Sequence, residues 1–207
     1  MSFYGLWPED DGPIGGGAYN DGEQGAESRN FEDFSGEYLV YVQCGSSGET
    51  GFNLRRIDPT ARDAEKLDAV LVIFVATRPD AGGQVVVGWY AGATCLASVA
   101  QQPSGRPYVA IADPTRAVLL PDAERSIAVP KGAGAMGQAN VAYAFQPTGE
   151  AHDGAWIDDV LQRVQAYQAP NLVTGAHYDD DDWAWRALWV VRSTSPRSPR
   201  HQADHVR

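Results

Sequence analysis

The chain has 207 residues, of which 43% are hydrophobic and 21% are charged, so neither wholesale disorder nor a fibrous repeat fits it. Its 27 acidic and 16 basic residues give a formal net charge of -11, which excludes nucleic-acid binding through a broad basic surface but leaves a local basic face open. Because no apolar stretch reaches the roughly 20 residues of a membrane-spanning helix and the start lacks a signal-peptide pattern, we expect a cytoplasmic protein without membrane contact.

The two ends of the chain differ in composition from its middle. Residues 1–35 are rich in glycine and acidic residues and poor in apolar ones, which predicts a flexible acidic segment. Residues 191–207 consist largely of Ser, Pro, Arg and other polar residues, a composition typical of a disordered basic tail. The folded domain is therefore expected over residues 36–190.

The middle contains several short runs with the composition of strands. The run 38–42 is the first, and the continuously apolar run 67–77 predicts a strand that is buried on both faces. Turn residues at 78–83 separate it from the run 84–90, so we expect a hairpin, and Gly88 marks a bulge or a close backbone approach in its second arm. Further strands are predicted at 94–99, 108–111, 117–120 and 139–145.

One helix is predicted, over residues 153–168. Trp156, Val160 and Val164 recur at the spacing of one helical face, Asp153 suits the N-cap, and Pro170 ends the pattern. Strands outnumber helices, so the expected fold is α+β. We expect a twisted, mainly antiparallel sheet that closes into a β-barrel, with this helix packed outside it.

Residues that usually carry catalysis are scarce. No nucleophile-elbow, P-loop or zinc-protease motif occurs, and His201 and His205 lie in the predicted tail. The run GAGAMG at 132–137 has the spacing of a dinucleotide-binding motif, but it follows Pro130 and Lys131 and not a strand, which disfavours that interpretation. Cys44 and Cys95 are too few for a four-thiolate zinc site and are expected to be packing residues. The sequence therefore favours a non-catalytic protein and requires no cofactor or metal.

The acidic run from His177 to Asp182 leaves one catalytic alternative open. Four consecutive aspartates bind a single cation only where a loop curls tightly, and runs of this kind usually form solvated loops. A small metal-dependent nuclease built on this run is kept as the second alternative.

Aromatic and amide side chains gather near the ends of predicted strands. Trp89 and Tyr90 end one strand, while Gln138 and Asn140 open another that carries Tyr143. Aromatic rings offer stacking faces and amides read donor and acceptor edges, which a pocket for an extruded base needs. The alternative is that Trp89 and Tyr90 are core aromatics and that Asn140 satisfies a backbone group.

The order of these segments resembles a known module. The segments read YLVYVQ, NLRRID, LDAVLVIFVAT, GGQVVVGWYAGAT, MGQANVAYAF and WIDDVLQRVQAY, and they span about residues 38–168. They resemble the N-terminal module of modification-dependent HNH restriction endonucleases of bacteria, which is similar to the EVE/PUA-like barrels. Members of that superfamily read modified or flipped bases in DNA or RNA. The most specific matches are Val87–Tyr90 and Gly137–Val141.

The resemblance implies a non-catalytic module that reads modified bases in a bacterial defence or restriction system. The implied pocket residues are Trp89, Tyr90, Thr94, Gln138, Asn140 and Tyr143. Arg55, Arg56 and Arg106 are expected to contact phosphates, since a few cations can position nucleic acid on an acidic protein. The expected partners are modified DNA or RNA, with a separate nuclease or regulatory protein.

The chain departs from the pattern of that module in three places. Ala91 and Gly92 stand where the module has a polar or basic residue and Asn, and Tyr143 is one aromatic where a pair is usual, which implies a wider or less polar pocket. After the helix come an acidic loop, a Trp-rich strand-like run and the tail, so the resemblance implies a reader without an attached nuclease or a fragment of a longer chain. These departures and the net negative charge together support the first alternative, which is a protein-interaction or regulatory module that has lost base binding.

Overall fold

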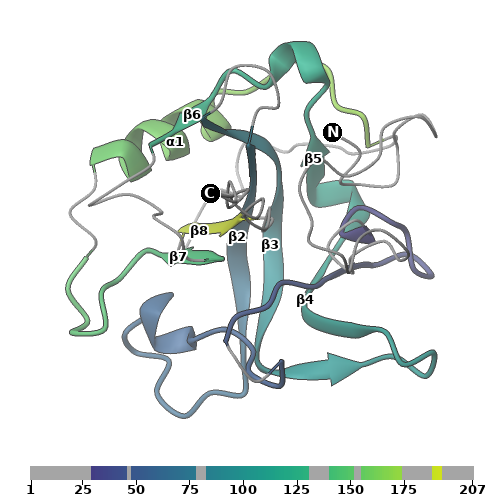
Figure 1. The fold of residues 1–207 in the computed structure, drawn as a ribbon, viewed down its shortest axis with the longest axis vertical. Helices are drawn as coiled ribbons and strands as arrows, with labels where there is room; N and C mark the ends of the chain where they lie inside the picture. The colour runs from purple at the N-terminus through teal and green to yellow at the C-terminus, as the bar shows by residue number, and fades with distance from the viewer. Residues whose placement is uncertain are drawn as a thin grey trace, which may run out of the picture.

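A computed structural model describes residues 29–45, 48–77, 83–130, 140–151, 155–173 and 188–192. In these residues the chain forms one eight-stranded sheet and one α-helix (Figure 1). The strands are β1 (Tyr38–Val40), β2 (Lys66–Thr77), β3 (Gln84–Gln101), β4 (Pro107–Ala112), β5 (Ala117–Leu119), β6 (Ala128–Val129), β7 (Val141–Tyr143) and β8 (Leu188–Arg192). The helices are α1 (Ala155–Gln165) and the 3₁₀ turns η3 (Leu54–Arg56), η4 (Pro114–Arg116) and η5 (Asp122–Glu124).

The sheet runs in the order β1-β4-β3-β2-β8-β7, and β5 and β6 pair with further parts of β3. Among the described strands every pairing is antiparallel except that of β2 with β8. The predicted mainly antiparallel sheet with one helix is therefore confirmed. β8 belongs to the strand-like run that the sequence places after the helix. Its position between β2 and β7 and its parallel pairing with β2 were not expected.

The predicted hairpin forms the centre of the sheet. β2 and β3 pair antiparallel, with register shifts between Leu67 and Val70, between Val70 and Val72, and between Phe74 and Val75. Each shift adds an unpaired residue that bends a strand and increases its twist. For this reason β3 continues for 18 residues through a bulge at Gly92 (φ 73°), where the sequence predicted two separate strands.

Gly88 is a point of close approach between β3 and β5. Val75 pairs with Val86 and Phe74 with Gly88, so a bulge lies directly before the glycine. A Cβ on Gly88 would collide with the Val118 carbonyl oxygen of β5 and with the ring of Phe31. Both the predicted bulge and the predicted close approach are confirmed.

The hairpin is covered on both faces. Residues 70–76 of β2 are all buried, as predicted for a strand with two covered faces. One face packs in a large cluster with Phe31, Tyr38 and Tyr90, and the other packs against Ile157, Val160 and Val164 of α1. The second layer, between the sheet and the helix, is called the α1-facing layer below.

The N-terminal boundary of the folded domain needs correction. Asn30 and Phe31 are buried, although the sequence placed them in the flexible segment 1–35. The Asn30 side chain donates to the Tyr41 carbonyl (3.2 Å) and accepts from the Tyr41 backbone amide (2.9 Å). These two bonds attach the segment around Asn30 to the residue that follows β1. Residues 1–28 and 193–207 lie outside the described residues, and β8 extends to Arg192, past the boundary predicted at residue 190.

Candidate functional site

Trp89 and Tyr90 lie on opposite faces of β3. Trp89 is 1% exposed in the α1-facing layer, where its ring meets Tyr167 edge-on at 5.4 Å between centroids. Tyr90 is fully buried on the other face, packs against Phe31, and donates its hydroxyl to the Asn30 carbonyl. Successive side chains of a strand point to opposite faces. The prediction that these two rings share one pocket is therefore corrected: both are core residues.

Thr94 lies at a bulge of the hairpin. Its hydroxyl donates to the Asp68 carboxylate (2.7 Å), beside Ala69, which has a positive φ of 60°. Nearby on β3, Gly92 lies under the guanidinium of Arg116, at a backbone angle that favours glycine. The contact with Arg116 and the positive φ explain why a glycine stands at position 92, where the sequence departs from the module it resembles. Thr94 has its hydrogen-bond partner within the hairpin.

Arg106 is a structural arginine. It is 8% exposed, and its Nη2 donates to the carbonyls of Arg29 (2.7 Å) and Leu39 (3.3 Å). Its Nη1 pairs with Glu32 at 3.4 Å. Burial lowers the pKa of the guanidinium, while Glu32 opposes that effect. The predicted phosphate contact of Arg106 is wrong, because the side chain is buried and bound to groups of the fold.

Three of the remaining predicted residues lie on two elements that touch, at a place that we call the η3–β7 corner. It is made of Arg55 and Arg56 on η3 with its N-cap Asn53, and of Tyr143 on β7 with Asn140 directly before that strand. The Arg56 guanidinium lies 4.4 Å above the centre of the Tyr143 ring, and its Nε donates to the Phe145 carbonyl (3.1 Å). The Tyr143 hydroxyl accepts a hydrogen bond from the backbone amide of Asn53 (3.1 Å). These contacts join η3 to β7, two segments far apart in the sequence.

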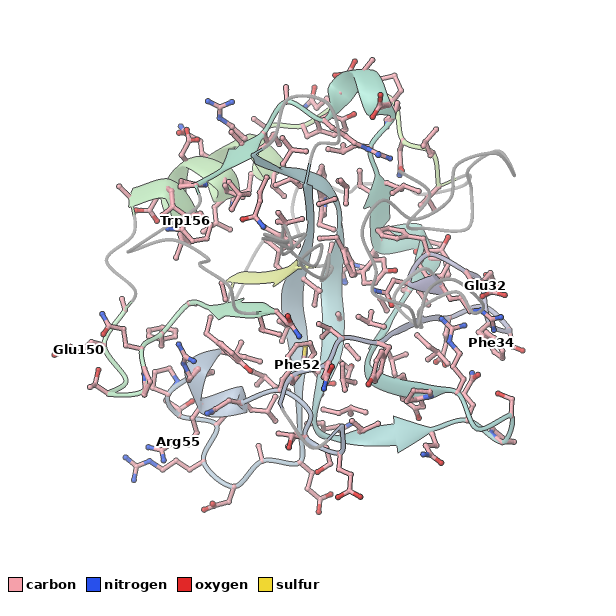
Figure 2. All side chains as sticks on the ribbon, viewed as in Figure 1. Glu32, Phe34, Phe52, Arg55, Glu150 and Trp156 are labelled. Carbon is pink, nitrogen blue, oxygen red and sulfur yellow. The ribbon has the colours of Figure 1, made fainter. Side chains whose placement is uncertain are left out.

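The two arginines of this corner differ in how they are held. Arg55 is exposed and lies at the periphery of the molecule (Figure 2). Arg56 is half-buried and is oriented by the Tyr143 ring and the Phe145 carbonyl. Glu32 and Phe34, which contact Arg106, lie on the other side of the view in Figure 2. Arg106 therefore belongs to a different part of the surface from Arg55.

Asn140 directly precedes β7. Its Nδ2 donates to the Gln43 carbonyl (3.1 Å), which fixes the orientation of the amide. The Oδ1 atom faces away from that bond and has no partner among the described residues. The alternative in which Asn140 satisfies a backbone group is what the structure shows. Asn53 and Gln43 were not predicted from the sequence, since each contributes through its backbone.

Tyr143 is held as a neutral phenol. Burial raises its pKa to about 12, and the hydrogen bond from Asn53 and the charge of Arg56 oppose part of this rise. The nearby thiols of Cys44 and Cys95 are not joined in a disulfide. Burial raises the pKa of Cys44 to about 12 and that of Cys95 also, so both behave as packing residues rather than as nucleophiles.

The other predicted sites lie outside what the structure describes. Gln138 and the run from His177 to Asp182 are not among the described residues. Within the described ranges no three His, Cys, Asp or Glu side chains come together as a metal site. No helix in the described part of the chain is long and apolar enough to cross a membrane.

Comparison with known proteins returned no match: no protein-family model, curated protein or solved structure matches this chain.

Proposed function

We propose that this protein is a non-catalytic module that reads modified bases in nucleic acid and that its contact surface is the η3–β7 corner. The observation that carries the proposal is the contact between η3, which carries Arg55 and Arg56, and β7, which Asn140 directly precedes. Phosphate contacts position a nucleic acid, and polar groups beside them read its bases. In this proposal the bent sheet closes toward an EVE/PUA-like barrel.

The arginines suit the phosphate role for different reasons. Arg55 is exposed, so it supplies a positive charge at the surface of a protein whose net charge is -11. Arg56 is held by Tyr143 and Phe145, and a guanidinium that is already oriented loses less side-chain entropy on binding. Together they form a small basic face of the kind that the overall acidity leaves open.

Asn140 suits the reading role. Because its Nδ2 is committed to the Gln43 carbonyl, its Oδ1 is left as an acceptor. An acceptor in this position would accept a hydrogen bond from a donor group of a base, such as the exocyclic amino group of cytosine or adenine. The proposal therefore favours bases whose amino group is present over bases in which it is replaced by a carbonyl.

The test is a binding series with oligonucleotides that carry modified cytosines or adenines, measured by fluorescence anisotropy at several salt concentrations. We expect Arg55→Gln to weaken binding to all sequences and to reduce the salt dependence by about one counterion. Asn140→Ala should reduce discrimination between bases by about 1–3 kcal/mol. Arg163→Gln is the matched control, since Arg163 is exposed on α1 and pairs with Asp159.

Two results would overturn the proposal. The first is a folded wild-type protein that binds none of the oligonucleotides at low salt. The second is an equal loss for Arg55→Gln and Arg163→Gln, which would show that binding follows net charge and not the corner. A stoichiometric protein partner found by co-purification, together with no nucleic-acid binding, would favour the alternative of an acidic interaction module.

A further inference from the structure

Gln84 carries a buried amide that lacks hydrogen-bond partners. It is the first residue of β3 and is 2% exposed, yet its side-chain nitrogen and oxygen both lack a partner among the described residues. Such groups are rare in folded proteins, because a buried amide without partners loses its bonds to water and gains none in return. The position therefore calls for a specific explanation.

The register of the hairpin places Gln84 in the α1-facing layer. Gln84 pairs with Thr77 of β2 and with Val129 of β6, and the pairing is regular from Gln84 to Val86. Residues two apart on a regular strand share a face, and Val86 belongs to the α1-facing layer. The buried hydrophobic side chains of that layer are aliphatic apart from Trp89, and the buried Arg125 donates its Nε to the carbonyl of Leu120 in the same layer. A polar amide thus lies at the hairpin end of an apolar layer.

Trp89 provides a second observation in the same layer. Its indole Nε1 is buried and has no partner among the described residues. The one other unpartnered buried side-chain atom in the described part of the chain is Nε of Arg106, which lies elsewhere. The α1-facing layer therefore holds most of the unsatisfied buried polar groups that the structure describes.

We propose that Gln84 is the reading group of a small-ligand site in the α1-facing layer. A carboxamide presents an N–H donor beside a carbonyl acceptor, so its complement is a molecule with the same pair on one edge. Primary amides and nucleobases both have such an edge. The aliphatic surroundings favour a neutral, planar ligand, because burial of a charge without a partner is costly. This site is separate from the η3–β7 corner and does not depend on nucleic-acid binding.

The experiment is thermal unfolding of the full chain with free nucleobases (adenine, cytosine and uracil) and with primary amides (nicotinamide and benzamide). We expect at least one compound to raise the Tm of the wild-type protein by about 3 °C or more at saturating concentration. Gln84→Met should abolish that rise, because it keeps the size of the side chain and removes the amide. Gln101→Met is the matched control, since Gln101 is exposed at the other end of β3. The two groups of compounds distinguish a nucleobase site from an amide site.

The ligand-free variants test the premise. Gln84→Met should melt at or above the wild-type temperature, because the unpartnered amide is gone. A lower Tm, or failure to fold, would show that the amide is already satisfied, for instance by an ordered water, and would overturn the proposal. It is also overturned if no compound shifts the wild-type Tm, or if the shift persists in Gln84→Met.

Discussion

Trp89 stabilises the sheet and the helix at once, because its buried ring packs in the α1-facing layer and meets Tyr167 just beyond α1. We expect Trp89→Ala to lower the free energy of unfolding by about 3–5 kcal/mol, measured by urea denaturation. Asn140→Ala is the comparison, with an expected loss of about 1 kcal/mol, since it removes a single hydrogen bond from a half-buried side chain. Similar small losses for both variants would show that the Trp89 ring is not in the core.

The raised pKa of Tyr143 predicts that the protein loses stability at alkaline pH. Its pKa rises from the ordinary value of 10.0 to about 12 in the folded protein, so the folded state holds the proton more tightly than the unfolded state. This contribution to stability is fully present below pH 10 and is lost as the pH rises from 10 to 12.

Between pH 10 and 12 the free energy of unfolding should fall less in Tyr143→Phe than in the wild-type protein. The difference between the two losses should be about 2–3 kcal/mol. Urea denaturation at a series of pH values measures the difference. Tyr108→Phe is the control variant and should follow the wild-type curve. Cys44 also loses its raised-pKa contribution between pH 9 and 12 in every variant, and it interacts electrostatically with Tyr143, so the difference between the curves reports Tyr143 together with that interaction. Parallel curves for Tyr143→Phe and the wild type would contradict the prediction.

At the residue scale the sequence predicts which side chains are buried better than it predicts the face of the sheet on which they lie. The run from Val85 to Tyr90 is apolar on both faces of β3, so the alternation that would tell the two faces apart is missing. Trp89 and Tyr90 could therefore not be assigned to different faces from the sequence alone. Arg106 could not be recognised as buried, because its main partners are backbone carbonyls of distant residues.

Among the elements, β5 depends on Gly88 of β3. A methyl group at this position would meet the backbone of Val118 as well as the Phe31 ring, and backbone cannot move aside as a flexible side chain can. We expect Gly88→Ala to cost about 1–3 kcal/mol or more, because overpacking forces the strands apart. Thermal unfolding measures the effect.

Gly36→Ala is the control for backbone strain. Gly36 has a φ of 88°, and no atom lies within 4 Å of the place that a methyl group on it would take, so only the conformational cost applies there. That cost is about 1 kcal/mol. If Gly88→Ala is no worse than Gly36→Ala, the close approach of β5 is not rigid in solution.

The segment before β1 is held by Arg106. Its guanidinium binds the Arg29 carbonyl and Glu32, and thereby fixes residues 29–32 beside the hairpin of β3 and β4. Arg106→Gln should lower the free energy of unfolding by about 2–4 kcal/mol, since bonds from a charged donor are lost inside the fold.

Limited proteolysis distinguishes this role from a general weakening of the fold. In Arg106→Gln, cleavage between residues 29 and 40 should become faster than cleavage within the hairpin. Arg62→Gln, at an exposed position, should leave both rates unchanged. Uniformly faster cleavage in Arg106→Gln would show that the arginine does not hold this segment in particular.

The elements that the sequence predicts correctly are those whose partners are close along the chain. β2 ends at Thr77 and β3 begins at Gln84, and α1 follows from its helical periodicity alone. The parallel pairing of β2 with β8 joins residues near 72 to residues near 189, and no local pattern specifies such a partner. The η3–β7 corner likewise depends on a long-range contact, although its Arg and Asn residues were singled out individually.

At the scale of the molecule, the C-terminal strand connects the corner to the rest of the sheet. β8 pairs with β2 along Leu71–Val75 and with β7 along Val141–Tyr143, so in the described sheet the backbone hydrogen bonds that link β7 to the hairpin run through β8 (Figure 1). Tyr143 belongs to β7 and Asn140 directly precedes it. The position of the proposed contact surface therefore depends on a strand that is the last described element of the chain.

This dependence gives the last prediction. A chain that ends before Leu188 should lose about 3 kcal/mol or more of unfolding free energy, a fall in Tm of about 6–12 °C, because β8 no longer pairs with either neighbour. A chain that ends after Arg192 keeps every described pair and should melt like the full protein. If the nucleic-acid contact is at the η3–β7 corner, the shorter chain should also lose binding at temperatures where it is still folded. Equal melting of the two truncated chains would show that β8 is not part of the sheet in solution.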